Sequence, residues 1–215
     1  MSELAATDTH SLRRVPRQAR SRERLLRLLD AGNQVLAREG AAALSTTRVA
    51  EASGVSIGSL YQYFPDKEAV AEALALRYWG ELADLVAGMA ELCEREGLDD
   101  PIDAVVQALA AGFRARPGFL ALWYGGLRSE RIRDATRPTR TAMGASIERI
   151  LAVHWPRAQA ARRTTAARML VLLGDGLLRE AFRIDPAGDE LVLAEGTIAL
   201  RAYASARLGK SEAHG

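Results

Sequence analysis

The chain has 215 residues, with 29 lysines and arginines against 27 aspartates and glutamates, so its formal net charge is +2. The length fits one ordinary domain or two small ones, and 48% hydrophobic with 26% charged residues excludes a disordered or fibrous protein. The 40 alanines favour helices, because alanine is the best helix former and is depleted in strands. The small net charge excludes a chain that is basic from end to end, although a local basic patch stays possible.

Seven prolines separate segments of helical periodicity, since proline breaks a helix interior but suits its first turn. The first helix is expected to end at Gly40 and to carry one apolar face: Leu25, Leu28, Leu29, Gly32, Val35 and Leu36. Asp66 is expected to cap a long helix over 67–95. Later helices are expected over 101–115, 118–131, 138–155, 156–183 and 189–208. Because no alternating strand pattern competes with them, the sequence predicts an all-α fold.

Two short helices are predicted between Gly40 and Lys67. Ser45 is a suitable N-cap for a helix over 46–52, and Ser56 for a second helix over 57–64. Gly54 lies between them in a tight turn, where it can adopt the positive φ of a helix C-cap. This arrangement is typical of a helix-turn-helix motif, whose second helix enters the DNA major groove.

The residue types of this segment suit DNA binding. Its serine and threonine hydroxyls can bind phosphate oxygens, and Tyr61 and Tyr63 can pack on the sugar-phosphate backbone. Ile57 can contact a thymine methyl group, and Thr47 and Gln62 can hydrogen-bond to bases. The core of the motif is predicted to contain Val49, Ala50, Val55, Leu60 and Phe64.

A basic segment precedes the motif. Residues 11–27 contain seven arginines and one acidic residue, Glu23, which gives a local charge of +6. Such a segment can neutralise phosphates or enter a neighbouring minor groove, whereas the alternative is a solvated charged tail. Its position directly before a helix-turn-helix favours the DNA-binding interpretation.

About residues 17–75 resemble the N-terminal domain of tetracycline-repressor-like (TetR/AcrR) transcriptional regulators, in the runs LLDAG, VLAREG, TTRVAEASGVS and SLYQYFPDKE. One departure is Val35-Leu36, where the family commonly has a bulkier residue, and we expect it to alter core packing only. The resemblance implies a flexible arm over 1–16, a DNA-binding domain over 17–67 with its helix-turn-helix at about 45–64, and a helical ligand-binding and dimerisation domain over 68–215. The residues that match the family's DNA-contacting positions are Ser45, Thr46, Thr47, Arg48, Ser56, Ile57, Gly58, Ser59, Tyr61, Gln62, Tyr63 and Lys67.

The last two predicted helices carry stripes of small and apolar residues that could form a four-helix dimer interface. The candidates are Leu170, Gly174, Leu177, Leu178, Ile198 and Ala202. The alternative is that both stripes face the protomer's own core. A homodimer is favoured because a helix-turn-helix normally binds symmetric half-sites as a dimer.

Aromatic and methionine side chains in the middle of the chain are candidates for an apolar ligand pocket: Trp79, Met89, Phe113, Phe119, Trp123, Tyr124 and Met143. Ordinary core packing is the alternative for each of them. The effector is therefore expected to be a mostly apolar small molecule. Gly125-Gly126 would either give local freedom to this region or permit tight packing.

An enzyme is disfavoured by the sequence. His10, His154 and His214 lie far apart, no glycine-rich phosphate loop or G-x-S-x-G motif occurs, and the single cysteine, Cys93, is interpreted as a buried thiol. We expect neither a metal nor a cofactor. Without an apolar run of about 18 residues or a signal segment in residues 1–10, the protein is expected to be cytoplasmic.

The functional prediction is a ligand-responsive transcriptional repressor that binds a palindromic operator in double-stranded DNA as a homodimer. An architectural DNA-binding protein without an effector is one alternative. A helical enzyme or carrier that has lost DNA binding is another.

Overall fold

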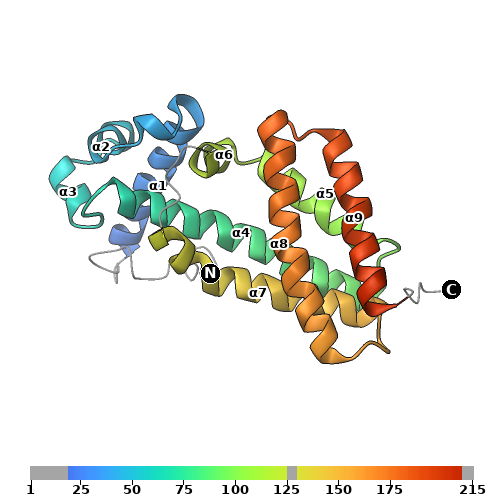
Figure 1. The fold of residues 1–215 in the computed structure, drawn as a ribbon. Helices are drawn as coiled ribbons and strands as arrows, with labels where there is room; N and C mark the ends of the chain where they lie inside the picture. Colours follow the sequence, from blue (N-terminus) through green and yellow to red (C-terminus); the bar gives the residue numbers. More distant parts are fainter. Residues whose placement is uncertain (1–18, 125–129, 210–215) are drawn as a thin grey trace. The chain divides into compact units, whose positions relative to one another are not determined.

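The computed structural model describes residues 19–124 and 130–209, and within these ranges it contains nine α-helices, one short 3-10 helix and no strand (Figure 1). The elements are α1 (Ala19–Glu39), η1 (Ala41–Ala43), α2 (Thr46–Ser53), α3 (Ile57–Tyr61), α4 (Lys67–Glu96), α5 (Pro101–Arg114), α6 (Pro117–Tyr124), α7 (Glu130–His154), α8 (Ala160–Ile184) and α9 (Glu190–Leu208). The predicted all-α class is confirmed. The expected arm over 1–16 and the Gly125-Gly126 pair lie outside the described residues.

The chain divides into two compact units. The first unit comprises Met1–Gly80 and Arg116–Arg137, and the second unit comprises Glu81–Ala115 and Pro138–Gly215. The helices α4 and α7 are therefore divided, and each contributes one part to the first unit and the other part to the second. The first unit brings α6 together with α1 to α3, although α6 lies much later in the sequence.

The core of the first unit is built around the apolar face of α1. The leucines and the valine predicted for this face are all buried, as is Gly32. A Cβ atom at Gly32 would lie 3.1 Å from Cδ1 of Leu74, so the glycine permits the close approach of α1 and α4. The predicted core residues of the two short helices are buried as well, except that Val55 is only half-buried.

A second close approach joins α6 to α1 and α4 within the first unit. The hydroxyl of Tyr78 donates a hydrogen bond to Oδ1 of Asn33, and Gly118 lies directly against this pair. A Cβ atom at Gly118 would lie 2.6 Å from the Tyr78 hydroxyl and 2.9 Å from the backbone oxygen of Asn33. Real Cβ atoms essentially never show contacts below 3.0 Å, so only glycine fits this position in the observed packing.

Several helix boundaries differ from the prediction. The helix α7 begins at Glu130 instead of Pro138, which lies inside the helix. The preceding turns are held by the first unit, because Ile132 and Thr136 are buried and Arg131 forms an ion pair with the buried carboxylate of Glu72. This packing outweighs the backbone hydrogen bond that proline cannot donate.

Another boundary concerns α3, which ends at Tyr61 instead of Phe64. Beyond Tyr61 the chain continues as a turn, in which the amides of Tyr63 and Phe64 both donate to the Leu60 carbonyl. Of the predicted helix over 118–131, the residues up to Tyr124 lie in α6 and the last two lie in α7, whereas 125–129 lie outside the described residues. The predicted helix over 156–183 begins four residues later, at Ala160, because Pro156 lies in a turn after α7.

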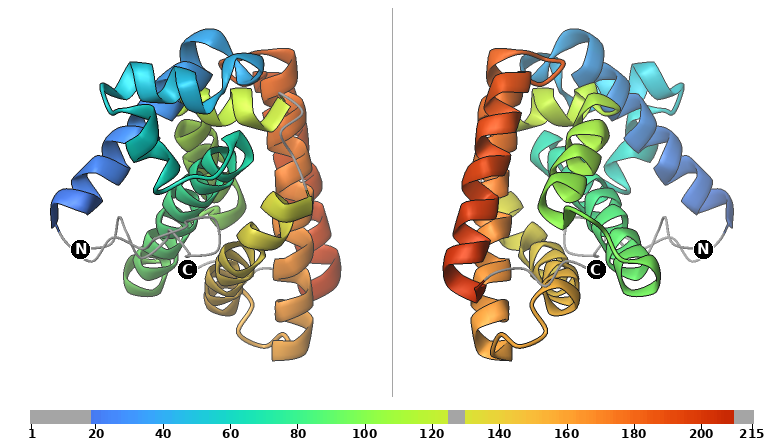
Figure 2. Two further views of the ribbon diagram at one scale, coloured as in Figure 1. Left: turned by 90° about the vertical axis from the view of Figure 1, so that its left-hand side faces the viewer. Right: turned by 90° about the vertical axis from the view of Figure 1, so that its right-hand side faces the viewer.

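In the second unit, α8 and α9 lie side by side, as both views of Figure 2 show. Gly196 of α9 permits this contact, because a Cβ atom there would lie 2.7 Å from Cγ of Leu177 in α8. Cys93 is buried, as interpreted from the sequence, and burial raises the pKa of its thiol. Among the described residues, no helix is both long and apolar enough to cross a membrane.

Candidate nucleic-acid interface

The two short helices begin and end as their sequence requires. The Ser45 Oγ accepts a hydrogen bond from the Arg48 amide at 3.1 Å, and the Ser56 Oγ accepts one from the Ser59 amide at 3.3 Å. Gly54 ends α2 with φ +65°, in the left-handed region that glycine adopts without strain. The two serine caps and the glycine turn therefore form a helix-turn-helix motif.

Most of the candidate DNA-contacting residues lie on the surface of the first unit. The exposed ones are Thr47, Arg48, Ser56, Ile57, Gly58, Tyr61, Gln62 and Lys67, and the half-buried ones are Ser45, Thr46 and Ser59. Tyr63 differs from the rest, since only 4% of it is exposed and its hydroxyl donates to the Ser21 carbonyl at 3.4 Å. Its ring thus belongs to the core of the first unit and offers little surface to a partner.

Hydrogen bonds link these polar side chains to one another. The hydroxyls of Thr46 and Tyr61 lie 3.3 Å apart, which joins the first turn of α2 to the last turn of α3. The Ser56 hydroxyl donates to the Ser59 Oγ at 2.9 Å. A Cβ atom at Gly58 would meet nothing within 4 Å, so the surface of α3 is open at this point. The motif therefore presents an ordered set of hydroxyl groups around an uncrowded helix.

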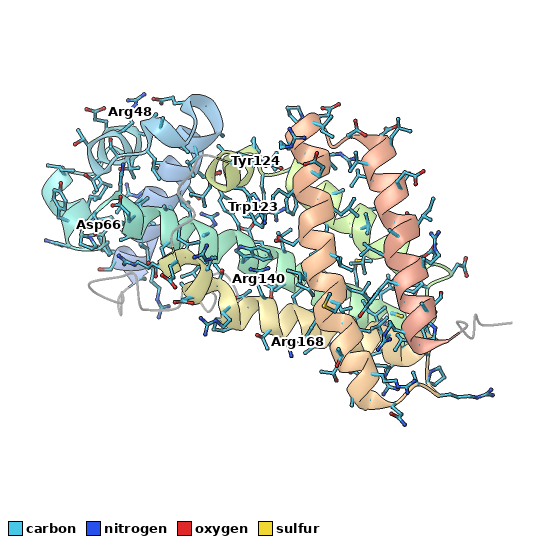
Figure 3. All side chains as sticks on the ribbon, in the orientation of Figure 1. Arg48, Asp66, Trp123, Tyr124, Arg140 and Arg168 are labelled. Atoms are coloured by element: carbon cyan, nitrogen blue, oxygen red, sulfur yellow. The ribbon has the colours of Figure 1, made fainter. Side chains whose placement is uncertain are left out.

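Arg48 is the one candidate that the structure places in an ion-pair network, on the surface of α2 (Figure 3). Its Nη2 and Nε donate to the two carboxylate oxygens of Glu39 at 2.8 and 3.0 Å, and its Nη1 donates to Glu51 at 3.3 Å. These hydrogen bonds lower the pKa of Glu39 and raise that of Arg48, so both groups are charged at neutral pH. Sequence reasoning missed this network, because Glu39 belongs to α1 and lies nine positions from Arg48.

The basic segment is described only in part. Arg20, Arg22, Arg24 and Arg27 belong to α1, where all but the half-buried Arg24 are exposed. The three remaining arginines of the segment precede the described residues. The described cationic groups of this segment thus all lie on α1.

The aromatic candidates for a ligand pocket do not form a single group. Trp79, Phe119 and Trp123 pack together in the first unit, with ring centroids 4.7 to 6.1 Å apart. Tyr78, which the sequence did not single out, joins this cluster 5.1 Å from Phe119. Tyr124 at the end of α6 is exposed (Figure 3).

The other pocket candidates belong to the second unit. Phe113 of α5 packs against Phe182 of α8 at 5.4 Å, and Phe182 is a residue that the sequence did not single out. Met143 is buried and Met89 is half-buried. The pocket assignment of all seven residues stays a prediction.

The dimer-interface candidates separate into two groups. Leu170 and Leu178 are buried within the chain, and Gly174 and Leu177 are half-buried. Ile198 and Ala202 are exposed. The interface candidates omit four further exposed aliphatic side chains of α8 and α9: Leu172, Leu173, Ile184 and Leu191. Leu191 could have been found from the helical period, because it lies seven positions before Ile198 and thus on the same face of α9.

Two family models match the chain. The model described as bacterial regulatory proteins of the tetR family matches residues 28–74, and the model of the tetracyclin repressor-like C-terminal domain matches residues 96–208. No curated protein matches the chain.

Solved structures share the fold over most of the chain. A TetR-family transcriptional regulator from Streptomyces coelicolor is 31% identical, with a TM-score of 0.63 over 87% of this chain and 99% of that one. The regulator FadR from Bacillus subtilis, solved with stearoyl-CoA, is 16% identical, with a TM-score of 0.64 over 84% of this chain and 98% of that one. The SmeT–triclosan complex is 19% identical, with a TM-score of 0.60 over 87% of this chain and 91% of that one.

A helix-turn-helix followed by a larger helical domain, matched by these models over both parts, defines a transcriptional regulator rather than an enzyme. The chain belongs to the TetR family of bacterial transcriptional regulators.

Proposed function

We propose that the protein is a repressor that binds a palindromic operator in double-stranded DNA as a homodimer and is released by a mostly apolar small molecule. The observation that carries the proposal is the helix-turn-helix surface, on which hydroxyl groups and Lys67 surround the open helix α3. Such groups bind phosphates and base edges, and a short helix of this kind fits the major groove. Residues 17–67 supply this DNA-binding function, and residues 68–215 bind the effector and the second subunit.

The dimer is supported by exposed aliphatic side chains in the second unit. Leu191 and Ile198 of α9 are 79% and 53% exposed, and Leu172 of α8 is 55% exposed. Several large apolar side chains exposed on two neighbouring helices are costly to leave in water, and such exposure is characteristic of protein interfaces. A second copy of the same two helices would cover them and form a four-helix interface. Two subunits then present two α3 helices to the two halves of a palindrome.

The proposed effector is a mostly apolar molecule. The FadR and SmeT structures, which share the fold, were solved with stearoyl-CoA and triclosan, respectively. In this chain, the packed rings of Trp79, Phe119 and Trp123 lie in the same unit as the helix-turn-helix. A ligand that favours one arrangement of these rings would shift the population away from the DNA-binding form.

Gel retardation tests the proposal with a duplex from the region upstream of the protein's own gene and a scrambled duplex of equal length. Selective retardation of the upstream duplex, with a steep salt dependence, supports an operator-binding regulator. Equal retardation of both duplexes favours the architectural alternative. Release of the upstream duplex by members of an apolar compound library tests the effector.

A pair of exposed tyrosines tests the docking surface. Tyr61 and Tyr124 are 42% and 39% exposed, but only Tyr61 belongs to the helix-turn-helix. Tyr61→Ala is expected to weaken binding of the upstream duplex about tenfold, through loss of a phosphate or backbone contact in each subunit. Tyr124→Ala, the matched control, is expected to bind as the wild type does. Wild-type affinity in Tyr61→Ala contradicts the proposed docking.

A further inference from the structure

The Arg48 network changes the charge of the surface that we propose to bind DNA. Between residues 28 and 67 the chain has three basic residues, Arg38, Arg48 and Lys67, against four acidic ones. Arg48 is held by Glu39 and Glu51, so these three side chains together carry a charge of −1. One of the few cations of this segment is thus neutralised where phosphates would approach.

The contact between Arg48 and Glu39 differs from an ordinary surface ion pair because it is made through two hydrogen bonds. Both oxygens of Glu39 accept hydrogen bonds from Arg48, and the third occupied donor, Nη1, is directed at Glu51. Three of the five guanidinium N–H donors are therefore committed to carboxylates. A phosphate or a guanine can be bound by the Nε and Nη2 donors in the same two-point manner only after Glu39 is displaced.

A DNA phosphate can displace Glu39 from Arg48. The side chains of Arg48 and Glu39 are 44% and 35% exposed, so water screens their attraction, and exposed pairs of this kind are weak. A duplex presents a row of phosphates, each of which can replace a carboxylate as the acceptor for the same fork of donors. The displaced carboxylate then faces the phosphate, which adds repulsion.

We propose that Glu39 is a positioning residue for DNA binding, which holds the Nε–Nη2 edge of Arg48 and must be displaced before this edge can bind a phosphate. Glu39 therefore lowers the affinity for DNA of any sequence, and operator contacts must overcome this restraint. This inference rests on the proposed DNA-binding function.

The experiment compares charge-matched variants of the full-length chain on a fluorescent 30-base-pair duplex of random sequence, by anisotropy at several salt concentrations. Glu39→Gln removes the restraint on Arg48. Glu94→Gln is the matched control, because Glu94 makes the same two-point contact with Arg149 in the second unit, at 2.8 and 2.5 Å. Both variants raise the net charge by one, so a difference between them reports the position and not the charge.

Glu39→Gln is expected to bind the duplex about three- to tenfold more tightly than Glu94→Gln at low salt. The slope of log affinity against log salt is expected to steepen by about 0.9 for each arginine that gains a phosphate. In the double variant Glu39→Gln/Arg48→Ala, both gains are expected to disappear. A purely structural role of Glu39 would not change the salt slope.

Arg48→Lys provides a second test that leaves Glu39 intact. Lysine keeps the charge but cannot make the two-point contact, so this variant is also expected to bind the duplex more tightly than the wild type. Equal affinity and slope in Glu39→Gln and Glu94→Gln, or weaker binding by Glu39→Gln, overturns the inference. If neither the wild type nor any variant binds a duplex at low salt, the DNA-binding function itself fails.

Discussion

The two units expose different kinds of side chain. The first unit presents hydroxyls, charged groups and two tyrosines, and its one large exposed aliphatic side chain among the described residues is Ile57. The described part of the second unit exposes five such side chains, all on α8 and α9 or directly at their ends: Leu172, Leu173, Ile184, Leu191 and Ile198. A polar surface suits a hydrated, anionic partner, whereas an apolar surface suits a second protein surface. The polarity of the exposed side chains therefore distinguishes the proposed DNA contact from the proposed dimer contact.

The two units also differ in how tightly their helices are joined. At Gly118 in the first unit, α6 meets a backbone oxygen and the Asn33–Tyr78 hydrogen bond. At Gly196 in the second unit, the three atoms nearest to an added Cβ atom all belong to the side chain of Leu177. A side chain can change its rotamer, but a backbone oxygen can move only with its helix. The contact at Gly118 should therefore tolerate an added Cβ atom less well than the contact at Gly196.

The largest effect is expected from the buried aromatic residues. Phe64→Ala should lower the free energy of unfolding by about 3–5 kcal/mol, because Phe64 is fully buried and its removal leaves a cavity. Urea denaturation, followed by tryptophan fluorescence, measures this loss. Phe182→Ala makes the same change at a buried position of the second unit. If both variants lower the same single transition, the two units unfold together; separate transitions would show that they are independent.

A smaller loss is expected at the glycine junctions. Gly118→Ala should lower the free energy of unfolding by about 1–3 kcal/mol, since the new Cβ atom would overlap Asn33 and Tyr78. Gly196→Ala should cost less, because Leu177 can move aside. Thermal unfolding of both variants tests the difference between the units. Gly88→Ala is the control: its Cβ atom meets nothing within 4 Å, so the variant should be slightly more stable than the wild type. A Gly118→Ala variant as stable as Gly88→Ala would contradict the described packing.

Substitutions of two exposed aliphatic residues test the proposed dimer contact and the proposed DNA contact separately. Ile198→Asp should weaken dimerisation about tenfold or more, because it places a charge in an apolar interface. Analytical ultracentrifugation over a range of concentrations measures this change. Ile57→Asp makes the same substitution at a residue of similar exposure on α3, and it should leave the dimer intact while abolishing retardation of the upstream duplex. A dimer that persists unchanged in Ile198→Asp would place the interface elsewhere.

The smallest effect concerns acid stability. The pKa of Glu94 lies below its ordinary value of 4.5, chiefly because the carboxylate accepts hydrogen bonds from Arg149. A carboxylate with a lowered pKa stabilises the folded state fully at pH above 4.5, and this contribution is lost as the pH falls through the folded-state pKa. Arg149→Met should therefore lower Tm more at pH 7 than at pH 3. A Tm difference that does not change with pH would contradict this assignment. Arg48→Met tests the equivalent pair of the first unit, since the pKa of Glu39 is lowered in the same way.

Local sequence signals predicted much of the fold and of the candidate site. The two serine caps, the glycine turn and the cap of α4 all form as their residue types require, with Asp66 Oδ1 accepting from the Ala69 amide at 2.7 Å. These features depend on residues within four positions of one another, so no distant contact is needed to form them. The apolar face of α1 was predicted for a similar reason, because a helix of fixed period places its leucines on one side.

The features that depend on distant residues were not predictable in this way. Pro138 was expected to begin a helix, but packing of Ile132 and Thr136 in the first unit extends α7 before it. The restraint of Arg48 by Glu39 depends on the contact between α2 and α1. The division of the pocket candidates between two units depends on segments that lie even farther apart in the sequence. Which residues of the α8 stripe are buried also depended on its neighbours, since Leu170 and Leu178 are buried whereas Gly174 and Leu177 are half-buried.

The near-neutral net charge of +2 is a sum over the whole chain, and the sequence alone located the basic segment over residues 11–27 that this sum conceals. The sequence by itself also determined the helical class and the helix-turn-helix, because caps, turns and helical periodicity are local properties. Only the tertiary structure decided which of the charges near the motif are already neutralised, and which apolar side chains remain exposed. Both are properties of the space between helices, where the partner of a side chain is fixed by packing and not by its distance along the chain.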